Sequence, residues 1–380
     1  MNRNTTSLFA LGLCAALALS ACSSEGSTDQ TSKSPAASAS AGTRVVQDTL
    51  GDVTVPDEAQ RIATTAPAFT TSVLLLGGAD KLVALEENYG KNEWIKEKYP
   101  ELSDLPVVFA ADETNMEELL ATEPDLVLYA SRYGEDTLKQ LQDLDIAAVS
   151  GAAGSDDPGY DHLNWVRDNQ LYFGEVIGGA QLDKATEYGD QFDAMRESID
   201  SQTKDLADED RPTVVEISAA GDVLQANNGS AIGQQHIELA GGTNAAADAD
   251  RESMGPSGQT QIEAEQLLTW NPDILLADSQ DIADEITGDP VLSELDAVQD
   301  NQVFVIPNGA MAWAYNGPEA YLAMQFFAKA IQPNLFEDLD IEENTVAFYH
   351  DYFGFDLDDD DLAYLFNLED GQDVADVFNR

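Results

Sequence analysis

The chain has 380 residues and a formal charge of −53, from 71 acidic and 18 basic side chains. A surface this negative argues against nucleic acid or anionic lipid as a partner, because both would be repelled. The length allows two sizeable hydrophobic cores. The acidity does not reveal a ligand, but it makes an arginine at a candidate site more informative.

Residues 1–21 are predicted to be a lipoprotein signal peptide. Arg3 makes the start weakly positive, and the apolar run Leu8–Leu19 is too short to span a bilayer. Leu19–Cys22 then has the lipobox pattern of small residues before a cysteine that becomes diacylated. We therefore expect Cys22 to carry a palmitate-type anchor on the extracytoplasmic face of the cell membrane. An ordinary signal peptide ending at Ala21 is the alternative.

Residues 22–43 are predicted to form a disordered tether, because they are rich in Ser, Ala, Thr and Gly and nearly lack large apolar side chains. Cys14 falls in the leader and Cys22 is the lipid site. The mature domain then has no thiol, which excludes a disulfide, a thiolate zinc site and a cysteine nucleophile.

Residues 44–165 are predicted to form a first α/β lobe. Apolar runs separated by glycine-ended helical patterns indicate a parallel sheet. The expected strands are Arg61–Thr65, Leu82–Leu85 and Ile146–Val149, and the expected helix is Phe69–Leu76.

Residues 166–210 are predicted to be a stiff helical link. Apolar residues recur at helical spacing from Ala185 to Ile199, after an interruption at Gly178-Gly179. A helix of about twenty residues spans about 30 Å, which suits a strut better than a hinge.

Residues 211–335 are predicted to form a second α/β lobe, and 336–380 an acidic tail with aromatic anchors. The expected strands of this lobe are Thr213–Ile217, Val223–Gln225 and Val303–Ile306. The expected helices are Ile232–Ala240 and Ala320–Ile331. In the tail, Asp356–Asp361 lacks the glycine and glutamate of a calcium loop, so we expect a solvated helix start there.

One segment occurs in both lobes. Met116–Ser131 and Ala264–Ser279 share paired leucines, a Pro-Asp corner and an apolar run, and Glu117 matches Glu265. Each copy has the pattern of a short amphipathic helix, a corner and a buried strand. The duplication predicts two similar lobes.

These elements resemble the solute-binding lipoproteins of bacterial iron-complex ABC importers, which capture siderophores, haem or cobalamin. The resemblance rests on QRIATTAPAFTTSVLLLGGADKLVAL, NMEELLATEPDLVL, AEQLLTWNPDILLADS and VFVIPNGAMAWAYNGPEAYLAMQFFAKAIQPNLF. It implies an α/β fold of two parallel-sheet, Rossmann-like lobes joined by a single long rigid helix, with a ligand cleft between them. It also implies that Glu117 and Glu265 face arginines of the permease. Favourable placement at a helix start is the alternative role for both.

Ligands of open parallel sheets bind outside the carboxyl ends of the strands. Arg132 follows such a strand in the first repeat copy. Its planar donors suit the carboxylate, hydroxamate or catecholate oxygens of a metal chelate. The alternative is a surface arginine paired with Glu135 or Asp136, and Arg251 is a weaker second candidate.

Other polar and aromatic residues follow predicted strands. Aromatic walls suit a bulky chelate, although such rings also pack between lobes. Asparagines there orient ligand oxygens or only form turns. The candidates are Tyr89, Tyr133, Trp313, Tyr315, Asn228 and Asn316.

Catalysis and a resident metal are not expected. The three histidines lack HxH or HxxxH spacing, so no preformed histidine site is predicted. His236 is expected to be structural, with a haem or nickel ligand as the alternative. Ser257 fails the GxSxG pattern because position 259 is Gln. We expect no enzyme activity and no cofactor.

The predicted function is capture of an iron(III)–siderophore-type chelate and its delivery to an ABC permease and ATPase, by a monomer tethered through Cys22. Within transport, the alternatives are a nickel chelate or an oxyanion such as molybdate or tungstate. An oxyanion needs converging hydroxyls, for which Thr64, Thr65, Ser131 and Ser230 are candidates. A surface receptor or adhesin that does not transport is the alternative from another class.

Overall fold

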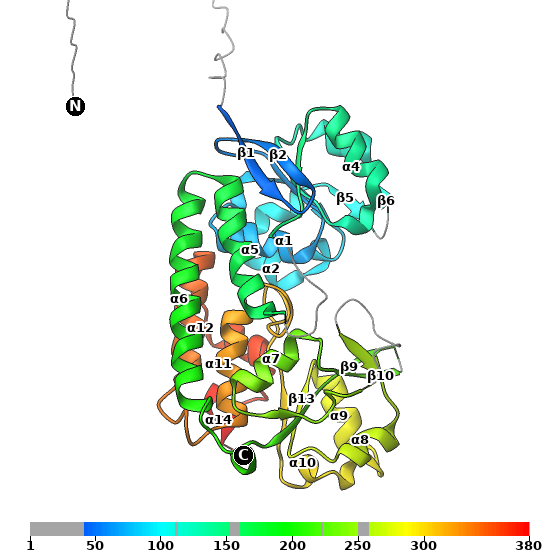
Figure 1. Ribbon diagram of the computed structural model, residues 1–380, viewed down its shortest axis with the longest axis vertical. Helices are drawn as coiled ribbons and strands as arrows, with labels where there is room; N and C mark the ends of the chain where they lie inside the picture. Colours follow the sequence, from blue (N-terminus) through cyan, green and yellow to red (C-terminus); the bar gives the residue numbers. More distant parts are fainter. Residues whose placement is uncertain (1–41, 111–112, 153–159, 222, 250–257, 380) are drawn as a thin grey trace, which may run out of the picture. The chain divides into compact units, whose positions relative to one another are not determined.

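The computed structural model describes residues 42–110, 113–152, 160–221, 223–249 and 258–379 (Figure 1). The predicted signal peptide, Cys22 and almost all of the tether lie outside the described residues, as do Arg251 and Ser257. The tether was expected to reach residue 43, but Thr43 already begins strand β1. No helix in the described ranges has both the length and the apolar character needed to cross a bilayer.

The first lobe is built on a six-stranded sheet with the order β6-β5-β4-β3-β7-β8. Its core strands are parallel and only the edge strand β6 is antiparallel, and a separate β1–β2 hairpin precedes it. The strands are β1 Thr43–Asp48, β2 Gly51–Pro56, β3 Ile62–Thr64, β4 Leu82–Glu86, β5 Val107–Ala110, β6 Glu113–Thr114, β7 Leu126–Leu128 and β8 Ala147–Val149. The helices are α1 Pro67–Leu75, α2 Glu93–Lys98, α3 Met116–Ala121 and α4 Gly134–Asp143.

The second lobe has the strand order β12-β10-β9-β13-β14, with β11 beside β9. Strands β9, β11, β13 and β14 are parallel, whereas β10 runs in the opposite direction and pairs antiparallel with both β9 and β12. The strands are β9 Thr213–Ala220, β10 Val223–Asn227, β11 Thr243–Asn244, β12 Gln259–Gln261, β13 Ile274–Ala277 and β14 Val303–Val305. The helices are α7 Ile232–Leu239, α8 Ala264–Trp270, α9 Gln280–Gly288, α10 Asp296–Gln299 and α11 Ala320–Ile331.

The repeated segment occupies the same position in both lobes, as α3–β7 and α8–β13. Its Pro-Asp corner fastens the first strand of each sheet. The Asp125 carboxylate accepts hydrogen bonds from the backbone N–H of Gln60 (2.9 Å) and Arg61 (3.0 Å). The Asp273 carboxylate accepts from the N–H and the hydroxyl of Thr213, both at 2.7 Å. Both copies of the corner therefore have the same structural role, which is to hold the first strand of their sheet.

Two helices run between the lobes, and the longer one is the expected strut. Helix α5, His162–Ile177, and the 24-residue α6, Ala180–Thr203, lie side by side (Figure 1). Gly178 and Gly179, with φ of 77° and 62°, reverse the chain between them. A Cβ at Gly178 would lie 2.3 Å from the Asp57 carbonyl oxygen, so this turn requires glycine.

Helix α6 is anchored in both lobes. Near its start, the Gln181 amide donates to the Gly77 carbonyl (3.3 Å), and at its end the Thr203 hydroxyl donates to the Leu239 carbonyl (2.7 Å). At about 1.5 Å per residue, the helix spans about 36 Å.

The segment expected to be an acidic tail is folded and contacts the first lobe. It contains α12 Ile341–Phe348, a π-helical turn at Tyr349–Phe353, α13 Asp359–Phe366 and α14 Val374–Phe378, which we call the C-terminal helices. Trp94 of α2 stacks on Tyr364 with ring centroids 5.6 Å apart, and the Tyr99 hydroxyl donates to the Phe353 carbonyl (2.5 Å).

Asp361 is buried, so the expectation of a fully solvated helix start at Asp356–Asp361 was wrong at this position. Its carboxylate accepts a hydrogen bond from the Trp94 indole N–H (2.9 Å) and pairs with Lys98 (2.5 Å). The acidic run therefore supplies a specific link to the first lobe.

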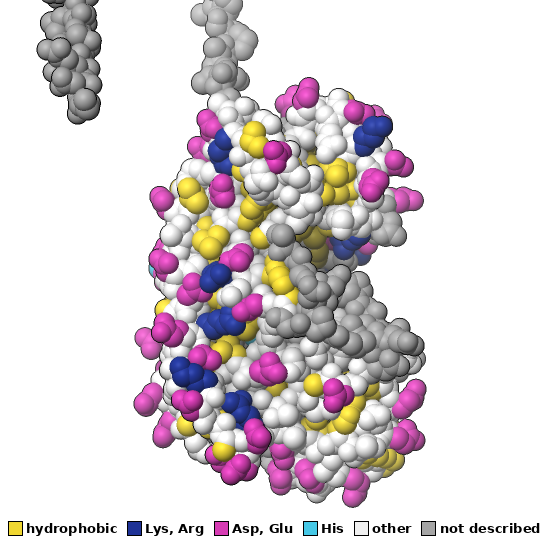
Figure 2. All heavy atoms as spheres, viewed as in Figure 1, with side chains coloured by type: hydrophobic (Ala, Val, Ile, Leu, Met, Phe, Trp, Pro, Cys, Tyr) yellow, Lys and Arg dark blue, Asp and Glu magenta, His cyan; other side chains and the backbone are white. Residues whose placement is uncertain are grey.

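Acidic side chains are spread over the face shown in Figure 2, with fewer Lys and Arg among them. The charge is thus distributed across the elements of this face.

Candidate ligand-binding site

The carboxyl ends of the two sheets meet across a direct contact. Asn92 follows β4 of the first lobe, and Gly309 and Ala310 follow β14 of the second. The Asn92 amide donates to both of these carbonyls at 3.2 Å. The edges where parallel sheets place their ligands therefore face one another.

Arg132 stands on the first-lobe side, in the turn after β7. Its guanidinium donates to the Thr65 carbonyl (2.9 Å) and to the Tyr133 hydroxyl (3.2 Å), and lies 5.1 Å from the centroid of the Tyr133 ring. The side chain keeps 43% of its surface exposed, so it is positioned and also accessible.

The ion-pair partner of Arg132 is Glu86, at 3.9 Å, rather than the surface acids Glu135 or Asp136. Glu86 ends β4 with a buried carboxylate that accepts from the N–H groups of Asn88 (2.9 Å) and Tyr89 (2.5 Å). Burial raises the pKa of Glu86, although these hydrogen bonds and Arg132 oppose the shift. The first lobe thus offers one exposed cation above one buried acid.

A small cavity of about 50 Å³ opens on the second-lobe side. Residues from α5, β9, β10, β12 and the segment after β14 surround it. The lining residues are His162, Glu216, Asn227, Ser230, Ile232, Gln259, Ala314, Tyr315 and Asn316. Two of the predicted site residues, Tyr315 and Asn316, therefore share this cavity.

One acid, Glu216, lines the cavity, and a second, Asp278, contacts the lining residue Tyr315. Glu216 is buried in β9, and Asp278 directly follows β13, the strand paired with β9. The Tyr315 hydroxyl donates to Asp278 over 3.4 Å. Burial raises the pKa of Asp278 to about 7, and burial together with the Asp278 charge raises the pKa of Glu216 well above its usual range.

Four other predicted ligand residues are buried. Tyr89 and Trp313, with exposed fractions of 3% and 0%, belong to the hydrophobic core, which corrects the expectation that they line the cleft. Tyr133 packs edge-on against Phe109, with ring centroids 5.2 Å apart, and supports Arg132 from below.

Asn228 is the fourth of these buried residues, and it forms a turn, which was the alternative role. Its side-chain oxygen accepts from the N–H and hydroxyl of Ser230 (2.9 and 2.7 Å), and its amide donates to Thr260 (2.8 Å). Both ends of the Asn228 amide are therefore engaged within the protein.

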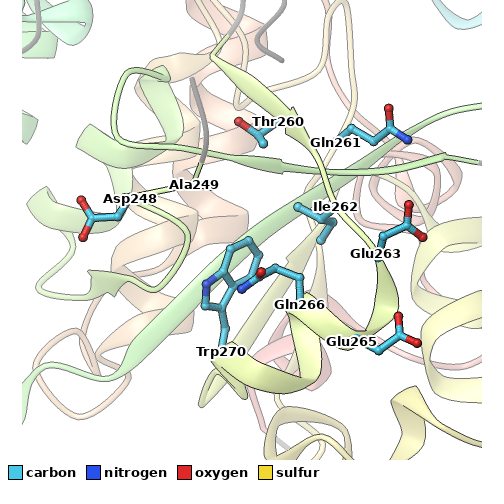
Figure 3. A pocket seen from close by; sticks show the side chains of 9 residues that line it. All are labelled: Asp248, Ala249, Thr260, Gln261, Ile262, Glu263, Glu265, Gln266 and Trp270. Carbon is cyan, nitrogen blue, oxygen red and sulfur yellow. The ribbon is translucent and has the colours of Figure 1, made fainter. Parts of the chain in front are cut away.

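Glu117 and Glu265 are both exposed in the first turn of their helices. Glu265 borders an open hollow of about 670 Å³ on the second lobe (Figure 3). Trp270, Gln266 and Ile262 also line it. The positions suit both predicted roles, permease docking and helix-start stabilisation.

The histidines occupy three different environments. His236 is fully buried, 4.9 Å from Phe327 between ring centroids, and burial lowers its pKa to about 3. His162 lines the cavity and His350 is exposed beside Asp351. Within the described ranges, no three His, Cys, Asp or Glu side chains gather in a way that would hold a metal ion.

The sequence reasoning named none of Glu216, His162 and Asp278 as a site residue. Glu216 is the one acid within the otherwise apolar run Val214–Ile217. A charged residue is seldom buried unless it has a partner, because its burial costs free energy. An acid within an apolar strand was therefore the feature of the sequence that could have indicated this site.

Two α/β lobes that face each other through the carboxyl ends of their sheets, bridged by a rigid helix, define a two-lobed solute-binding protein. The chain belongs to the family described as periplasmic binding protein, which it matches over residues 62–310. This confirms the resemblance and the predicted fold class. The family consists of binding proteins, in agreement with the prediction that the chain is not an enzyme.

The chain is similar to the "Molybdate-binding protein MolA" of Haemophilus influenzae, with 26% identity over 82% of this chain and 91% of that protein. A molybdate-bound structure of MolA matches with a TM-score of 0.70 and 23% identity, covering 83% of this chain and 99% of that one.

Two Bacillus subtilis proteins are also similar. One is the "Uncharacterized ABC transporter substrate-binding lipoprotein YvrC", 24% identical over 76% of this chain and 84% of that protein. The other is the "Fe(3+)-citrate-binding protein YfmC", 24% identical over 77% of this chain and 86% of that protein.

Proposed function

We propose that the chain is the extracytoplasmic substrate-binding protein of an ABC importer and that it captures an iron(III) chelate of the siderophore type. The observation that carries this proposal is Arg132. It is exposed at the sheet edge, held in place by the Thr65 carbonyl and stacked on Tyr133. A fixed guanidinium with free N–H donors suits the oxygen-rich, negatively charged surface of a ferric chelate. The similarity to YfmC, whose name states ferric citrate binding, supports the same class.

An oxyanion is the second candidate, and the similarity to MolA favours it. Three of the four hydroxyls proposed for it are engaged within the protein. Thr64 and Thr70 share a hydrogen bond of 2.6 Å, the Thr65 hydroxyl accepts from the Ala130 N–H (2.6 Å), and the Ser230 hydroxyl donates to Asn228. A small oxyanion needs several converging donors that it can reach, and Thr64 and Thr65 are fully buried, so this arrangement favours the chelate.

The same proposal includes delivery. A lipid on Cys22 would keep the protein at the outer face of the membrane, and the similarity to a lipoprotein of an ABC transporter supports that anchor. Glu117 and Glu265, one exposed on each lobe, would face arginines of the permease, and the ATPase would drive uptake. We expect the protein to act as a monomer.

Ligand titrations test the proposal. Intrinsic fluorescence and thermal unfolding of the purified protein would be followed with ferric trihydroxamates, ferric citrate, haem, cobalamin and molybdate. We expect at least one ferric chelate to bind, and Arg132→Gln to weaken that binding about tenfold or more, which corresponds to about 1.4 kcal/mol. Arg167→Gln is the control, because Arg167 pairs with Asp193 on the linking helices.

Binding of molybdate together with no response to any ferric chelate would refute the iron proposal and favour the oxyanion. An equal loss in both arginine variants would show that Arg132 acts only through general charge.

A further inference from the structure

The cavity of the second lobe contains a buried acceptor oxygen that no described residue engages in a hydrogen bond. Strand β9 directs Val215 and Ile217 into one hydrophobic cluster and Glu216 to the opposite face, toward the cavity. Only 2% of Glu216 is exposed, and its Oε2 has no hydrogen-bond partner among the described residues. Burial of a carboxylate oxygen without a hydrogen-bond partner costs free energy. Its presence at the edge of the sheet where ligands bind therefore indicates that a ligand group could supply the partner.

The backbone keeps space for this carboxylate. A Cβ at Gly233, near the start of α7, would lie 1.9 Å from Glu216 Oε2 and 2.7 Å from the Asn227 amide nitrogen. Any larger residue at 233 would occupy the position of the carboxylate. Glycine here allows the acid to sit against the helix without being covered by a side chain.

Asp278 adds a second acceptor beside Glu216. Its side chain is partly exposed, and the long 3.4 Å contact with the Tyr315 hydroxyl leaves most of its acceptor capacity free. The other titratable groups that line the cavity are His162 from α5 and Tyr315 from the segment after β14. Neither Lys nor Arg is among the described residues that line this cavity.

We propose that Glu216 and Asp278 form an acceptor subsite that holds a positively charged, N–H-bearing group of the ligand, such as a primary ammonium. This inference rests on the proposed function and specifies the ligand further. Two carboxylates repel an oxyanion but attract a cation, and ammonium hydrogens satisfy the free Glu216 oxygen.

The size of the cavity defines which part of the ligand enters. A volume of about 50 Å³ accepts one small group, whereas sites for whole drug-sized ligands measure about 300 Å³ or more. The ammonium end would therefore insert here, while the oxygen-rich chelate remains at the sheet edges and meets the first-lobe cation Arg132. The two lobes would recognise opposite charges on one ligand.

Proton linkage gives the subsite a pH dependence. Burial raises the pKa of Asp278 to about 7, so part of the acid pair is protonated in the free protein near neutrality. A bound ammonium favours the ionised acids, and binding then releases a proton. Affinity for an ammonium-bearing ligand should therefore increase as the pH rises from about 6 to about 8, until the acids are fully ionised.

A matched pair of chelates tests the subsite. Ferrioxamine B is a ferric trihydroxamate with a terminal primary amine, and acetylation of that amine removes the charge and leaves the iron centre unchanged. We expect the protein to bind the amine form about tenfold more tightly. Glu216→Gln should remove this preference while affinity for the acetylated form stays unchanged, and Glu238→Gln, an exposed change on α7, should preserve it.

Asp278→Asn provides a second variant if Glu216→Gln unfolds, and each variant would be checked by thermal unfolding. A preference that persists in both variants, or that is absent in the parent protein, overturns the subsite. If neither trihydroxamate binds but another ferric chelate does, the ammonium subsite fails and the proposed function stands. If no chelate binds, both fail.

Discussion

The buried ion pair between Lys98 and Asp361 should stabilise the protein by joining the first lobe to the C-terminal helices. The Lys98 ammonium lies 2.5 Å from Asp361 Oδ1, and the two side chains are only 14% and 7% exposed. Removing one partner of a buried pair costs about 3–5 kcal/mol. In Asp361→Asn an amide oxygen still accepts from the Trp94 indole, so we expect the lower end of that range, about 3 kcal/mol.

Thermal unfolding and a double-mutant cycle measure the effect. With an unfolding entropy of about 2 cal/mol/K per residue, a loss of about 3 kcal/mol lowers the Tm of the folded domain by about 4 °C. Lys98→Met alone should also destabilise, because it leaves the Asp361 charge buried without a cation. The double variant should recover about 2 kcal/mol relative to the sum of the single changes.

An exposed pair in the same lobe provides the control. Lys91 and Glu87 lie 3.6 Å apart, with 69% and 36% of their side chains exposed, and Lys91→Met should cost less than about 1 kcal/mol. If the losses of unfolding free energy in the two single variants add up to the loss in the double variant within about 0.5 kcal/mol, Lys98 and Asp361 are not coupled. That result would refute the proposed link between the lobe and the C-terminal helices.

The remaining predictions concern His236 and the duplicated corner. Burial lowers the pKa of His236 to about 3 from its ordinary 6.5, so the unfolded chain binds a proton that the folded protein does not. Stability should fall by about 1.4 kcal/mol per pH unit as the pH decreases below 6.5, and His236→Leu should flatten the acid limb of a Tm–pH profile. An unchanged acid limb would contradict this. Asp273→Asn should cost about 1 kcal/mol in denaturant unfolding, because Oδ2 accepts both bonds from Thr213. Asp125→Asn should cost a similar amount in the other lobe, and a loss in only one lobe would show that the corners are not equivalent.

Much of the fold could be predicted from local pattern. The expected strands Arg61–Thr65 and Ile146–Val149 correspond to β3 and β8, and the expected helix Ala320–Ile331 corresponds to α11. Apolar runs and glycine stops carry this information because they reflect local periodicity and backbone freedom. The strand Val223–Gln225 was expected and corresponds to β10, but its antiparallel direction was not foreseen, since strand direction depends on which neighbour the strand pairs with.

The candidate site was less accessible to prediction. Arg132 lies in the turn after β7, and Tyr315 and Asn316 lie in the segment after β14, as expected, because the ends of the apolar runs show where the strands stop. Trp313 and Tyr89 were expected in the cleft and are in the core, since a ring in a loop faces whichever partner the rest of the chain brings to it.

The sequence by itself determined that two similar α/β lobes exist, through the repeat of Met116–Ser131 as Ala264–Ser279, and that a long helix connects them. These features can be recognised from the spacing of apolar residues along a segment, which depends only on residues close together in the chain. Only the tertiary structure decided that Asp361 meets Lys98 and that Glu216 lines a cavity whose Tyr315 contacts Asp278. Such pairings join residues far apart in the chain, so their burial and pKa values depend on packing that no local pattern records.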